Sequence, residues 1–374
     1  MLFGIVGKPS SGKSTFFSAA TEIEVKISPR PFTTIDPNKG TTLIFSKCPC
    51  SEFKLKCNPM NSKCEKGIRQ IPVNIIDLLG IVPEAHKGKG LGNKFLDEVR
   101  TADVLIHVVD ISGTTDEFGN PAENYDPSKE IEFVENEIIH WIVGILKRAK
   151  RLTLEDIAKQ LTGLKIKKED IEEIYKESSF DEEGIINFAR KIKEKAMPTI
   201  IAANKIDLDK KNNFEKIKEK YKEKIIIPVY ADGELALVRA RKKGIISYSI
   251  YEKNFEIIKA TKEQEEALER IRKIIERYGS TGVRETLQLA FFELWKGIIV
   301  YPVSDEKNLT DNFGNVLPDA IPLKKGSRVI DLAEKIHSDL AKNFLFAIDA
   351  RKKMRIGRDY VLNHDDIIKI VAAK

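Results

Sequence analysis

A glycine-bounded segment near the N-terminus constrains this chain most. Residues 7–14 read GKPSSGKS, between an apolar run at residues 2–6 and a helix-forming run at residues 15–20. A strand, this loop and a helix in that order form a P-loop, in which glycines let the backbone wrap a polyphosphate and the helix N-terminus supplies amides and a positive dipole. The segment therefore predicts a nucleotide-binding α/β domain.

The side chains of this loop have separate expected roles. Lys13 would place a point charge at the outer phosphates, and Ser14 would offer its hydroxyl to Mg²⁺. The predicted nucleotide-binding residues of the loop are Gly7, Lys8, Pro9, Ser10, Ser11, Gly12, Lys13, Ser14 and Thr15.

A second motif, NKID at residues 204–207, follows an apolar run and is expected to select the base. The Asp207 carboxylate can accept from two adjacent N–H groups, which guanine presents and adenine does not, while Asn204 and Lys205 brace the loop. ATP would leave that carboxylate unpaired, at a cost of roughly 1–3 kcal/mol. The amide of Ala231, after the next strand, is expected to read the guanine carbonyl. Together the motifs predict a GTPase.

Two segments between these motifs are expected to act as switches. Residues 73–80, VNIIDLLG, read as a strand ending in Asp-x-x-Gly. Asp77 would hold Mg²⁺ through water, and the Gly80 amide would reach the γ-phosphate. Upstream, the segment at residues 31–40 carries two adjacent threonines, one of which can complete the Mg²⁺ shell. Both switches would close on GTP and relax after hydrolysis.

Composition limits the remaining choices. A chain of 374 residues exceeds one ordinary core, so we expect two or three domains. The net charge of +6, from 63 basic and 57 acidic residues, is a weak argument for nucleic acid. No apolar run approaches the roughly 20 residues of a membrane span, and the N-terminus enters a strand without a signal peptide. We therefore expect a cytoplasmic monomer that binds neither membrane nor DNA.

The cysteines are confined to one short segment: Cys48, Cys50, Cys57 and Cys64. A tetrathiolate zinc site would explain this clustering, although the spacing lacks the paired Cys-x₂-Cys knuckles typical of zinc sites. Two disulfides are an alternative, because intracellular disulfides occur in hyperthermophiles, and free thiols are another. The sequence leaves all three interpretations open.

The spacing of apolar runs predicts the domain organisation. A buried strand at 104–110 is separated from the strand at 199–203 by far more than a βαβ crossover requires, so we expect an inserted helical subdomain. Apolar residues from Ile131 to Ile145 recur at three- and four-residue spacings, which is typical of a helical hairpin or short coiled coil with residues 185–192. A plain amphipathic helix on the core is the alternative.

Beyond residue 294 the pattern changes to that of a small α+β domain. A helix is expected at 328–342, with strands at 298–303, 344–349 and 367–371. We therefore predict an α/β fold: a mostly parallel P-loop GTPase sheet with helices on both faces, a coiled-coil-like insert and a C-terminal domain. The expected boundaries are 1–112 and 197–293 for the GTPase domain, 113–196 for the insert and 294–374 for the last domain.

The ordered motifs resemble the YchF family, also called Obg-like ATPases, within the Obg-related translation-factor GTPases. Three segments support the resemblance: residues 31–40 (PFTTIDPNKG), 86–96 (HKGKGLGNKFL) and 357–362 (GRDYVL). The last resembles the end of a TGS domain, which has a small ubiquitin-like fold. The resemblance implies a P-loop nucleoside triphosphatase that associates with ribosomes, with Thr34 as the threonine that contacts Mg²⁺ and the γ-phosphate.

Two residues depart from the family pattern. Family members that prefer ATP usually carry Glu where this chain has Asp207, so we expect GTP, with an ATP-preferring enzyme as the alternative. Relatives that use potassium carry Asn where this chain has Ser10, which argues against potassium stimulation.

The residue after Gly80 bears on the rate of hydrolysis. Ile81 stands where Ras-type enzymes have the Gln that orients the attacking water. We therefore expect slow hydrolysis, in which Lys13, Mg²⁺ and loop amides stabilise charge and an outside group completes the site. His86 is a candidate contributor, and a contact with a partner is its alternative role.

Positive charge in the C-terminal part suits ribosomal RNA, and a solvated surface is the alternative interpretation. A nucleotide-gated scaffold on ribosomes or RNA, with incidental hydrolysis, is the alternative to an enzyme. The basic residues are Lys324, Lys325, Arg328, Arg351, Lys352, Lys353, Arg355 and Arg358.

Overall fold

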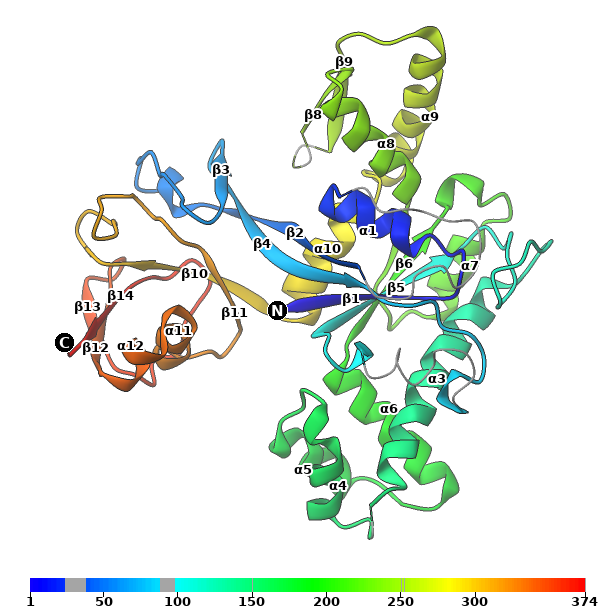
Figure 1. Cartoon of the computed structure of the whole chain (residues 1–374), viewed down its shortest axis with the longest axis horizontal. Helices are drawn as coiled ribbons and strands as arrows, with labels where there is room; N and C mark the ends of the chain where they lie inside the picture. The colour runs from blue at the N-terminus through cyan, green and yellow to red at the C-terminus, as the bar shows by residue number, and fades with distance from the viewer. Residues whose placement is uncertain (24–37, 88–97, 150, 250, 252, 374) are drawn as a thin grey trace. The chain divides into compact units, whose positions relative to one another are not determined.

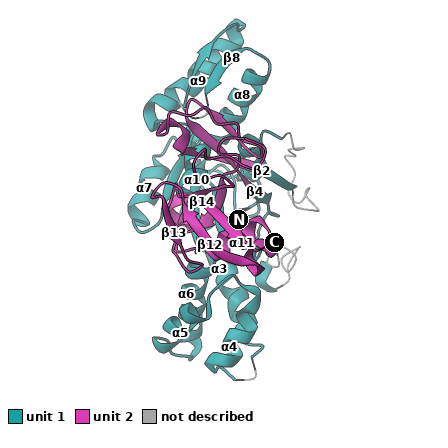
Figure 2. Ribbon diagram, turned by 90° about the vertical axis from the view of Figure 1, so that its left-hand side faces the viewer, with its two compact units in different colours: residues 1–41, 74–290 teal, residues 42–73, 291–374 magenta. Residues whose placement is uncertain are grey.

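The structure, a computed structural model, describes residues 1–23, 38–87, 98–149, 151–249, 251 and 253–373. Two compact units divide the chain (Figure 2): Met1–Thr41 with Asn74–Ala290, called unit 1, and Thr42–Val73 with Phe291–Lys374, called unit 2. Within the described residues, no helix is both long and apolar enough to cross a membrane.

A seven-stranded sheet has most of its strands in unit 1, in the order β2-β4-β1-β5-β6-β7, with β3 (Lys63–Glu65) pairing antiparallel to β4. Strand β3 and parts of β2 and β4 fall within residues 42–73, which are assigned to unit 2. The pairings of β1 with β4 and β5, of β5 with β6 and of β6 with β7 are all parallel. The strands are β1 (Leu2–Val6), β2 (Asn38–Lys47), β4 (Ile68–Asp77), β5 (Val104–Asp110), β6 (Thr199–Asn204) and β7 (Ile226–Val229). Every residue of β5 is buried, as expected of a parallel strand covered on both faces.

Helices cover both faces of this sheet (Figure 1). One group consists of α1 (Lys13–Thr21), α8 (Ala231–Lys242) and α10 (Val283–Leu289), in which α1 contacts the other two. The second group is centred on α3 (Pro127–Leu146), which contacts β5, α6 (Glu182–Ala196) and α7 (Asn213–Lys220). The predicted mostly parallel P-loop sheet with two helical layers is confirmed.

The predicted helical insert consists of α3, α4 (Leu154–Gln160), α5 (Lys168–Lys176) and α6. Asp126 begins α3 by accepting a hydrogen bond from the Ser128 N–H at 2.9 Å. Ile138 of α3 and Phe188 of α6 belong to one hydrophobic cluster that also contains Leu105 of β5. The helical hairpin and the helix on the core, which the sequence left as alternatives, are therefore both present: α3 pairs with α6 and packs on the sheet.

A small hairpin-and-helix segment follows β7 and α8 in the chain. It contains a hairpin that the sequence analysis missed, β8 (Ile246–Ser249) with β9 (Asn254–Ile257), and the helix α9 (Lys262–Tyr278). The α9 helix begins with a capping box between Thr261 and Gln264 and ends at Gly279, whose φ is 82°.

Unit 2 contains a five-stranded sheet in the order β11-β10-β14-β12-β13. Its strands are β10 (Gly297–Val303), β11 (Ile321–Lys324), β12 (Phe344–Asp349), β13 (Met354–Ile356) and β14 (Ile367–Ala372). The predicted strands at 298–303, 344–349 and 367–371 are thus confirmed.

The single helix predicted at 328–342 is wrong. The structure has two helices there, α11 (Val329–Ile336) and α12 (Ser338–Lys342), separated by His337 in an extended conformation. The His337 ring accepts a hydrogen bond from the Asp339 N–H at 3.2 Å and so begins a new helix. Such local bonds from a side chain to the backbone compete with helix continuation.

The unit division also differs from the boundaries expected from the sequence. Residues 42–73, which include all four cysteines, belong to unit 2 and not to the GTPase domain around them in sequence. The Asn58 N–H donates to the Val316 carbonyl at 3.1 Å, and the Met60 N–H donates to the Pro318 carbonyl at 2.9 Å. Hydrogen bonds between segments so far apart in the chain are not encoded in local sequence patterns.

Candidate nucleotide-binding site

Two glycines shape the loop between β1 and α1. Gly7 has a φ of 148° and Gly12 a φ of 96°, values that residues with a Cβ rarely adopt. A Cβ on Gly7 would lie 2.4 Å from the Val108 carbonyl oxygen, and one on Gly12 would lie 2.2 Å from the Asn204 Nδ2 atom. The α1 helix begins at Lys13 without a side-chain cap among the described residues. Its first amides are therefore available to an anion.

The side chains predicted to bind Mg²⁺ and phosphate lie together at the start of α1. The Ser14 hydroxyl donates to Asp77 Oδ2 at 2.7 Å, and Lys13 Nζ donates to the Lys8 carbonyl at 2.7 Å. Burial lowers the pKa of the Lys13 ammonium, against the pull of the Asp77 carboxylate, and burial raises the pKa of Asp77. Asp77 Oδ1 is buried without a hydrogen-bond partner among the described residues.

These observations fit a divalent cation. A buried carboxylate oxygen with no donor, beside a hydroxyl on the same carboxylate, is a donor set of the oxygen type that Mg²⁺ prefers. Both Ser14 and Asp77 are therefore suitable to hold Mg²⁺. Thr34, the third predicted Mg²⁺ contact, lies outside the described residues.

The base-reading motif is joined to the P-loop by Asn204, the last residue of β6. Its Nδ2 donates to the Ser11 carbonyl at 2.9 Å, and its Oδ1 accepts from the Ala231 N–H at 3.1 Å. Lys205 follows in the left-handed conformation, with a φ of 62°, and its Nζ donates to the buried Asp110 carboxylate at 2.8 Å. Hydrogen bonds thus join the P-loop, the end of β5, the end of β6 and the start of α8.

Asp207 lies in the short 3₁₀ turn Ile206–Leu208, and its carboxyl group is exposed. Partial desolvation by the surrounding protein raises the pKa of this carboxyl, and the nearby Asp232 carboxyl acts in the same direction. A ligand with two N–H donors would offset both effects, because hydrogen bonds to the charged form favour it.

The segment after β4 turns back to the P-loop. The Ile81 N–H donates to the Gly7 carbonyl at 3.1 Å, and a Cβ on Gly80 would lie 3.2 Å from Pro9. The Ile81 side chain is buried in the cluster that the strands share with the insert. Gly80 is therefore beside the phosphate loop, and Ile81 is a core residue.

His86 is held by α3. Its Nδ1 lies 2.6 Å from Glu137 Oε2, and its backbone N–H donates to the same oxygen at 2.9 Å. The other oxygen of Glu137 accepts from the Glu84 N–H at 2.7 Å, and the His140 ring meets the His86 ring edge-on with centroids 5.0 Å apart. The sequence analysis did not identify Glu137. Residues 88–97 of the glycine-rich segment lie outside the described residues.

Comparison with known proteins agrees with this geometry. Three family models match: the model MMR_HSR1, 50S ribosome-binding GTPase, over residues 2–147; the Obg-like GTPase YGR210-like, G4 motif-containing domain, over residues 202–305; and the TGS domain over residues 313–372. A GTP-binding protein of Methanocaldococcus jannaschii, itself named as uncharacterized, is 49% identical over 100% of this chain and 99% of its own length. The chain belongs to the Obg-like family of P-loop GTPases.

Two other similar proteins extend the comparison. The crystal structure of a GTP-binding protein from Pyrococcus horikoshii is 37% identical, covers 100% of both chains and has a TM-score of 0.78. The ribosome-binding ATPase YchF of Mycoplasma genitalium is 27% identical over 97% of each chain. The family, the fold and the C-terminal TGS domain inferred from the sequence are thus confirmed.

A loop that the sequence analysis missed contacts the P-loop of this Obg-like protein. Lys8 is fully buried, and its Nζ donates to the Thr115 carbonyl at 2.6 Å and to the Asp116 carbonyl at 2.8 Å. A Cβ on Gly119 would lie 2.8 Å from the Pro9 carbonyl oxygen. The Lys8 side chain is therefore engaged with the loop after β5, and only its backbone is available to phosphate. The polar, glycine-containing run at residues 112–120 was the signal that could have revealed this contact.

Burial also acts on the acidic partners of Lys8. Glu130 of α3 is fully buried 3.7 Å from Lys8 Nζ, and burial raises the pKa of its carboxyl to about 7 despite that lysine. Its Oε2 accepts a hydrogen bond from the Asp110 N–H at 3.2 Å. Glu130 therefore contacts Lys8 of the P-loop and the end of β5, and we do not expect it to contact a nucleotide.

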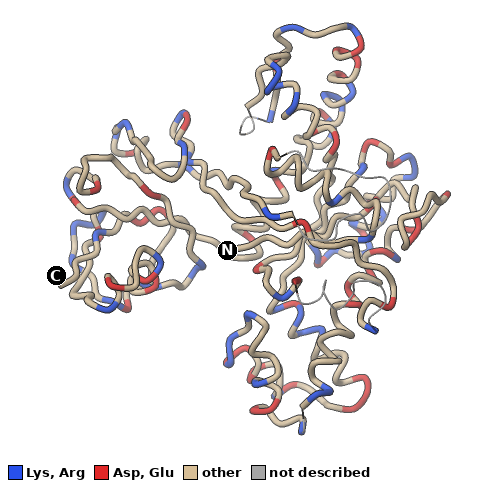
Figure 3. Tube along the Cα trace, in the orientation of Figure 1, with Lys and Arg blue, Asp and Glu red and all other residues tan. Residues whose placement is uncertain are grey.

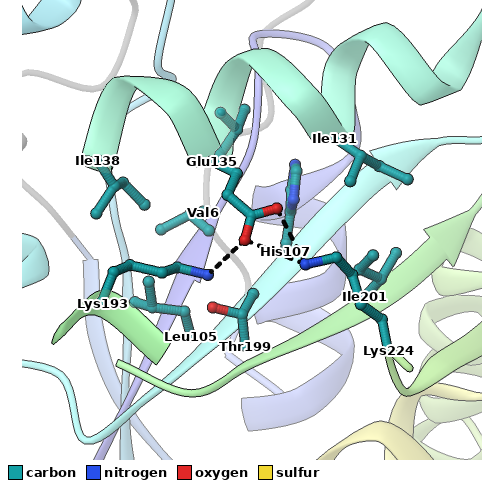
Figure 4. Close-up of a pocket in the computed structure, with 11 residues that line it drawn as sticks. Val6, Leu105, His107, Ile131, Glu135, Ile138, Lys193, Thr199, Ile201 and Lys224 are labelled. Carbon is teal, nitrogen blue, oxygen red and sulfur yellow. Dashed lines mark hydrogen bonds and ion pairs between the residues drawn. The ribbon is translucent and has the colours of Figure 1, made fainter. Parts of the chain in front are cut away.

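A small cavity of 20 Å³ lies elsewhere in unit 1, between β5, α3 and α6 (Figure 4). Glu135 of α3 accepts from Lys193 at 3.3 Å and from Lys224 at 3.0 Å, and His107 of β5 points into the same region. Since this volume has room for about one water molecule, we regard the cavity as part of the core.

The four cysteines also come together. Their sulfur atoms all lie within 4.8 Å of one another, and each cysteine is a free thiol in the structure.

Proposed function

We propose that this protein is a Mg²⁺-dependent GTPase with slow intrinsic turnover, whose nucleotide state controls its binding to ribosomes or ribosomal RNA. The observation that carries the proposal is the position of Asn204, which bonds the Ser11 carbonyl of the P-loop and the Ala231 amide at once. The base-reading motif is therefore hydrogen-bonded directly to the phosphate-binding loop. A ribosome-linked role would also make the protein cytoplasmic.

The preference for GTP over ATP rests on Asp207. Its exposed carboxyl has room for a ligand, and guanine offers two adjacent N–H donors where adenine offers no such pair. Both polar atoms of the Asn204 side chain already form hydrogen bonds within the protein. Asn204 therefore fixes the loop, while Asp207 and the backbone read the base.

The chemistry assigned to Mg²⁺ is charge neutralisation on the phosphates. Ser14 would hold the ion directly and Asp77 through water, while Lys13 and the first amides of α1 contact the phosphate oxygens. The side chain of Ile81 is buried in the core and has no polar atom, so it cannot orient a water molecule. The chain's own residues therefore bind and stabilise charge, and an external group is expected to complete the hydrolytic site.

Nucleotide titration tests this proposal. GTP should bind the purified protein more tightly than ATP in calorimetry. Asp207→Asn should lower GTP affinity roughly ten- to hundredfold, because the guanine N–H groups lose a charged acceptor and a hydrogen bond to a charged group contributes about 1.5–3 kcal/mol. ATP affinity should change little. Glu219→Gln, an exposed change of the same kind on α7, is the control and should leave both affinities unaltered.

Equal affinities for GTP and ATP would contradict the proposed preference. An ATP-preferring enzyme is the second candidate, favoured by the name of the M. genitalium relative, and Asp207→Glu should then improve ATP binding. Turnover measured with and without ribosomes separates an enzyme from a scaffold. Nucleotide-dependent ribosome affinity without any stimulation of hydrolysis would favour the scaffold.

A further inference from the structure

The four cysteines of unit 2 converge on one point. Cys48 follows β2 directly, and Cys50 lies in the 3₁₀ turn Pro49–Ser51. Cys57 lies in the following loop and Cys64 lies in β3. The sulfur atoms of Cys48 and Cys57 are 4.0 Å apart, those of Cys50 and Cys64 are 3.8 Å apart, and all four lie within 4.8 Å of one another. Four sulfurs bound to one zinc at about 2.3 Å in a tetrahedron are separated by about 3.8 Å.

We propose that Cys48, Cys50, Cys57 and Cys64 bind one structural Zn²⁺ ion as a tetrathiolate site. Four ligands fill a tetrahedral shell and leave no open position, which is the pattern of structural and not catalytic zinc. Two disulfides would need each sulfur to lie close to one partner only, with the two pairs apart from each other. A mutual approach of all four sulfurs is instead the arrangement that a shared cation requires.

A buried arginine beside the cluster supports this assignment. Arg69 is fully buried, and its Nη2 donates to Cys48 Sγ at 3.5 Å and to the Leu317 carbonyl at 2.8 Å. Its other partners among the described residues are the Ser62 hydroxyl and the face of the Tyr301 ring. The described residues show no carboxylate in ion-pair contact with Arg69, although the Asp319 carboxyl lies near enough to be affected by its charge.

A buried guanidinium without an anionic partner is costly. Zinc would remove this cost, because four thiolates around one Zn²⁺ leave a net charge of about −2, and Arg69 would then face an anion. The Cys50 backbone N–H also donates to the Cys48 sulfur, which adds a second donor to the same ligand.

A bound divalent cation deprotonates the thiols that coordinate it, so protons should be released as zinc binds.

The site would hold the cysteine segment onto the C-terminal residues of the same unit. Asn58, between Cys57 and Cys64, donates through Nδ2 to Asn315 Oδ1 at 2.8 Å, and Arg69 reaches the Leu317 carbonyl. Residues 49–66 contain only short regular elements, so few backbone ladder bonds fix this segment without a metal. Zinc binding should therefore stabilise unit 2.

Metal and thiol analysis tests the proposal. Protein purified without chelator should contain one zinc per chain, and a mercurial that reacts with the thiols should release that zinc. Reduced, metal-free protein should bind one added Zn²⁺, and added Co²⁺ should show the absorption bands of a tetrahedral thiolate complex. Absence of metal with four reactive thiols, absence of metal with none before reduction, or iron in place of zinc would overturn the assignment.

Variants separate the metal site from the nucleotide site. Cys57→Ser should lose stoichiometric zinc, while Lys63→Ser, an exposed change in the same segment, should keep it. GTP binding should survive in both variants, since the nucleotide site lies in unit 1. If Cys57→Ser does not fold, zinc titration of the reduced wild-type chain decides the question. A Cys57→Ser variant that retains one tightly bound zinc would contradict the proposal.

Discussion

Gly12 of the phosphate loop has no room for a side chain beside the base-reading motif. Its φ of 96° already disfavours a side chain, and a Cβ there would lie 2.2 Å from Asn204 Nδ2. Gly12→Ala should therefore displace Asn204 and lower GTP affinity by at least tenfold, measured by calorimetry or by a fluorescent nucleotide.

Gly244 offers a matched control for this substitution. Its φ is 65°, but nothing lies within 4 Å of the Cβ that would be added. Gly244→Ala should cost about 1 kcal/mol of stability from backbone strain and leave GTP affinity unchanged. If both variants bound GTP like the wild type, the contact between Gly12 and Asn204 would have no part in nucleotide binding.

At the scale of elements, β5 is covered on both faces and carries a titratable residue. Burial lowers the pKa of His107 to about 3, and Lys193 of α6 acts in the same direction. The unfolded chain, with a histidine pKa of about 6.5, therefore binds a proton that the folded chain does not. Stability contributed by neutral His107 is complete above about pH 6.5 and is lost as the pH falls towards the folded-state pKa.

Replacing His107 should reduce the loss of unfolding free energy as the pH falls. Between pH 6.5 and 5, His107 should account for up to about 2 kcal/mol of lost unfolding free energy, at 1.36 kcal/mol per pH unit. His107→Gln should lack this part of the loss in denaturant unfolding followed across that range. Lys210→Gln, an exposed change in the same unit, is the control and should leave the pH profile as in the wild type. Identical pH profiles for wild type and His107→Gln would refute the prediction.

At the scale of the molecule, the charges of unit 2 are mixed (Figure 3). Arg351 pairs with Glu52, Arg328 pairs with Asp359 at 2.9 Å, and Lys352 Nζ lies 2.9 Å from Asp349. These ion pairs reduce the positive charge that the sequence assigned to an RNA-binding surface. Lys353, which is exposed, is therefore a better residue than Lys352 for testing contact with RNA.

Salt dependence should reveal such contact. Ribosome affinity, measured by sedimentation or filter binding, should fall steeply as salt rises if phosphates are contacted. Lys353→Glu should lower that slope by about one, because one phosphate contact is lost. Lys210→Glu, an exposed change in unit 1, is the control and should leave the slope unaltered. A slope unaffected by Lys353→Glu would favour a solvated surface at this position.

Local patterns in the chain predicted β1, β4, β5, β6 and β7 of the first sheet, β10, β12 and β14 of the second, and the motifs at their ends. The strands β2, β3, β11 and β13 were not predicted. Continuous apolar runs indicated β5 and β6, and the strand-loop-helix order indicated the P-loop, because these features depend on neighbours within a few residues. The break at His337 and the hairpin β8–β9 were missed, since one ring-to-backbone hydrogen bond and a small hydrophobic cluster decide them.

The sequence by itself determined the family, the parallel sheet and the residue types that surround a nucleotide, because short motifs encode that chemistry. Only the tertiary structure decided which side chains meet. In the folded protein, buried Lys8 hydrogen-bonds the loop after β5, and His86 contacts Glu137 of α3. The four cysteines lie together, and Arg69 hydrogen-bonds one of them, Cys48. Each of these contacts joins residues brought together by packing, and packing of that kind leaves no local periodicity from which it could be predicted.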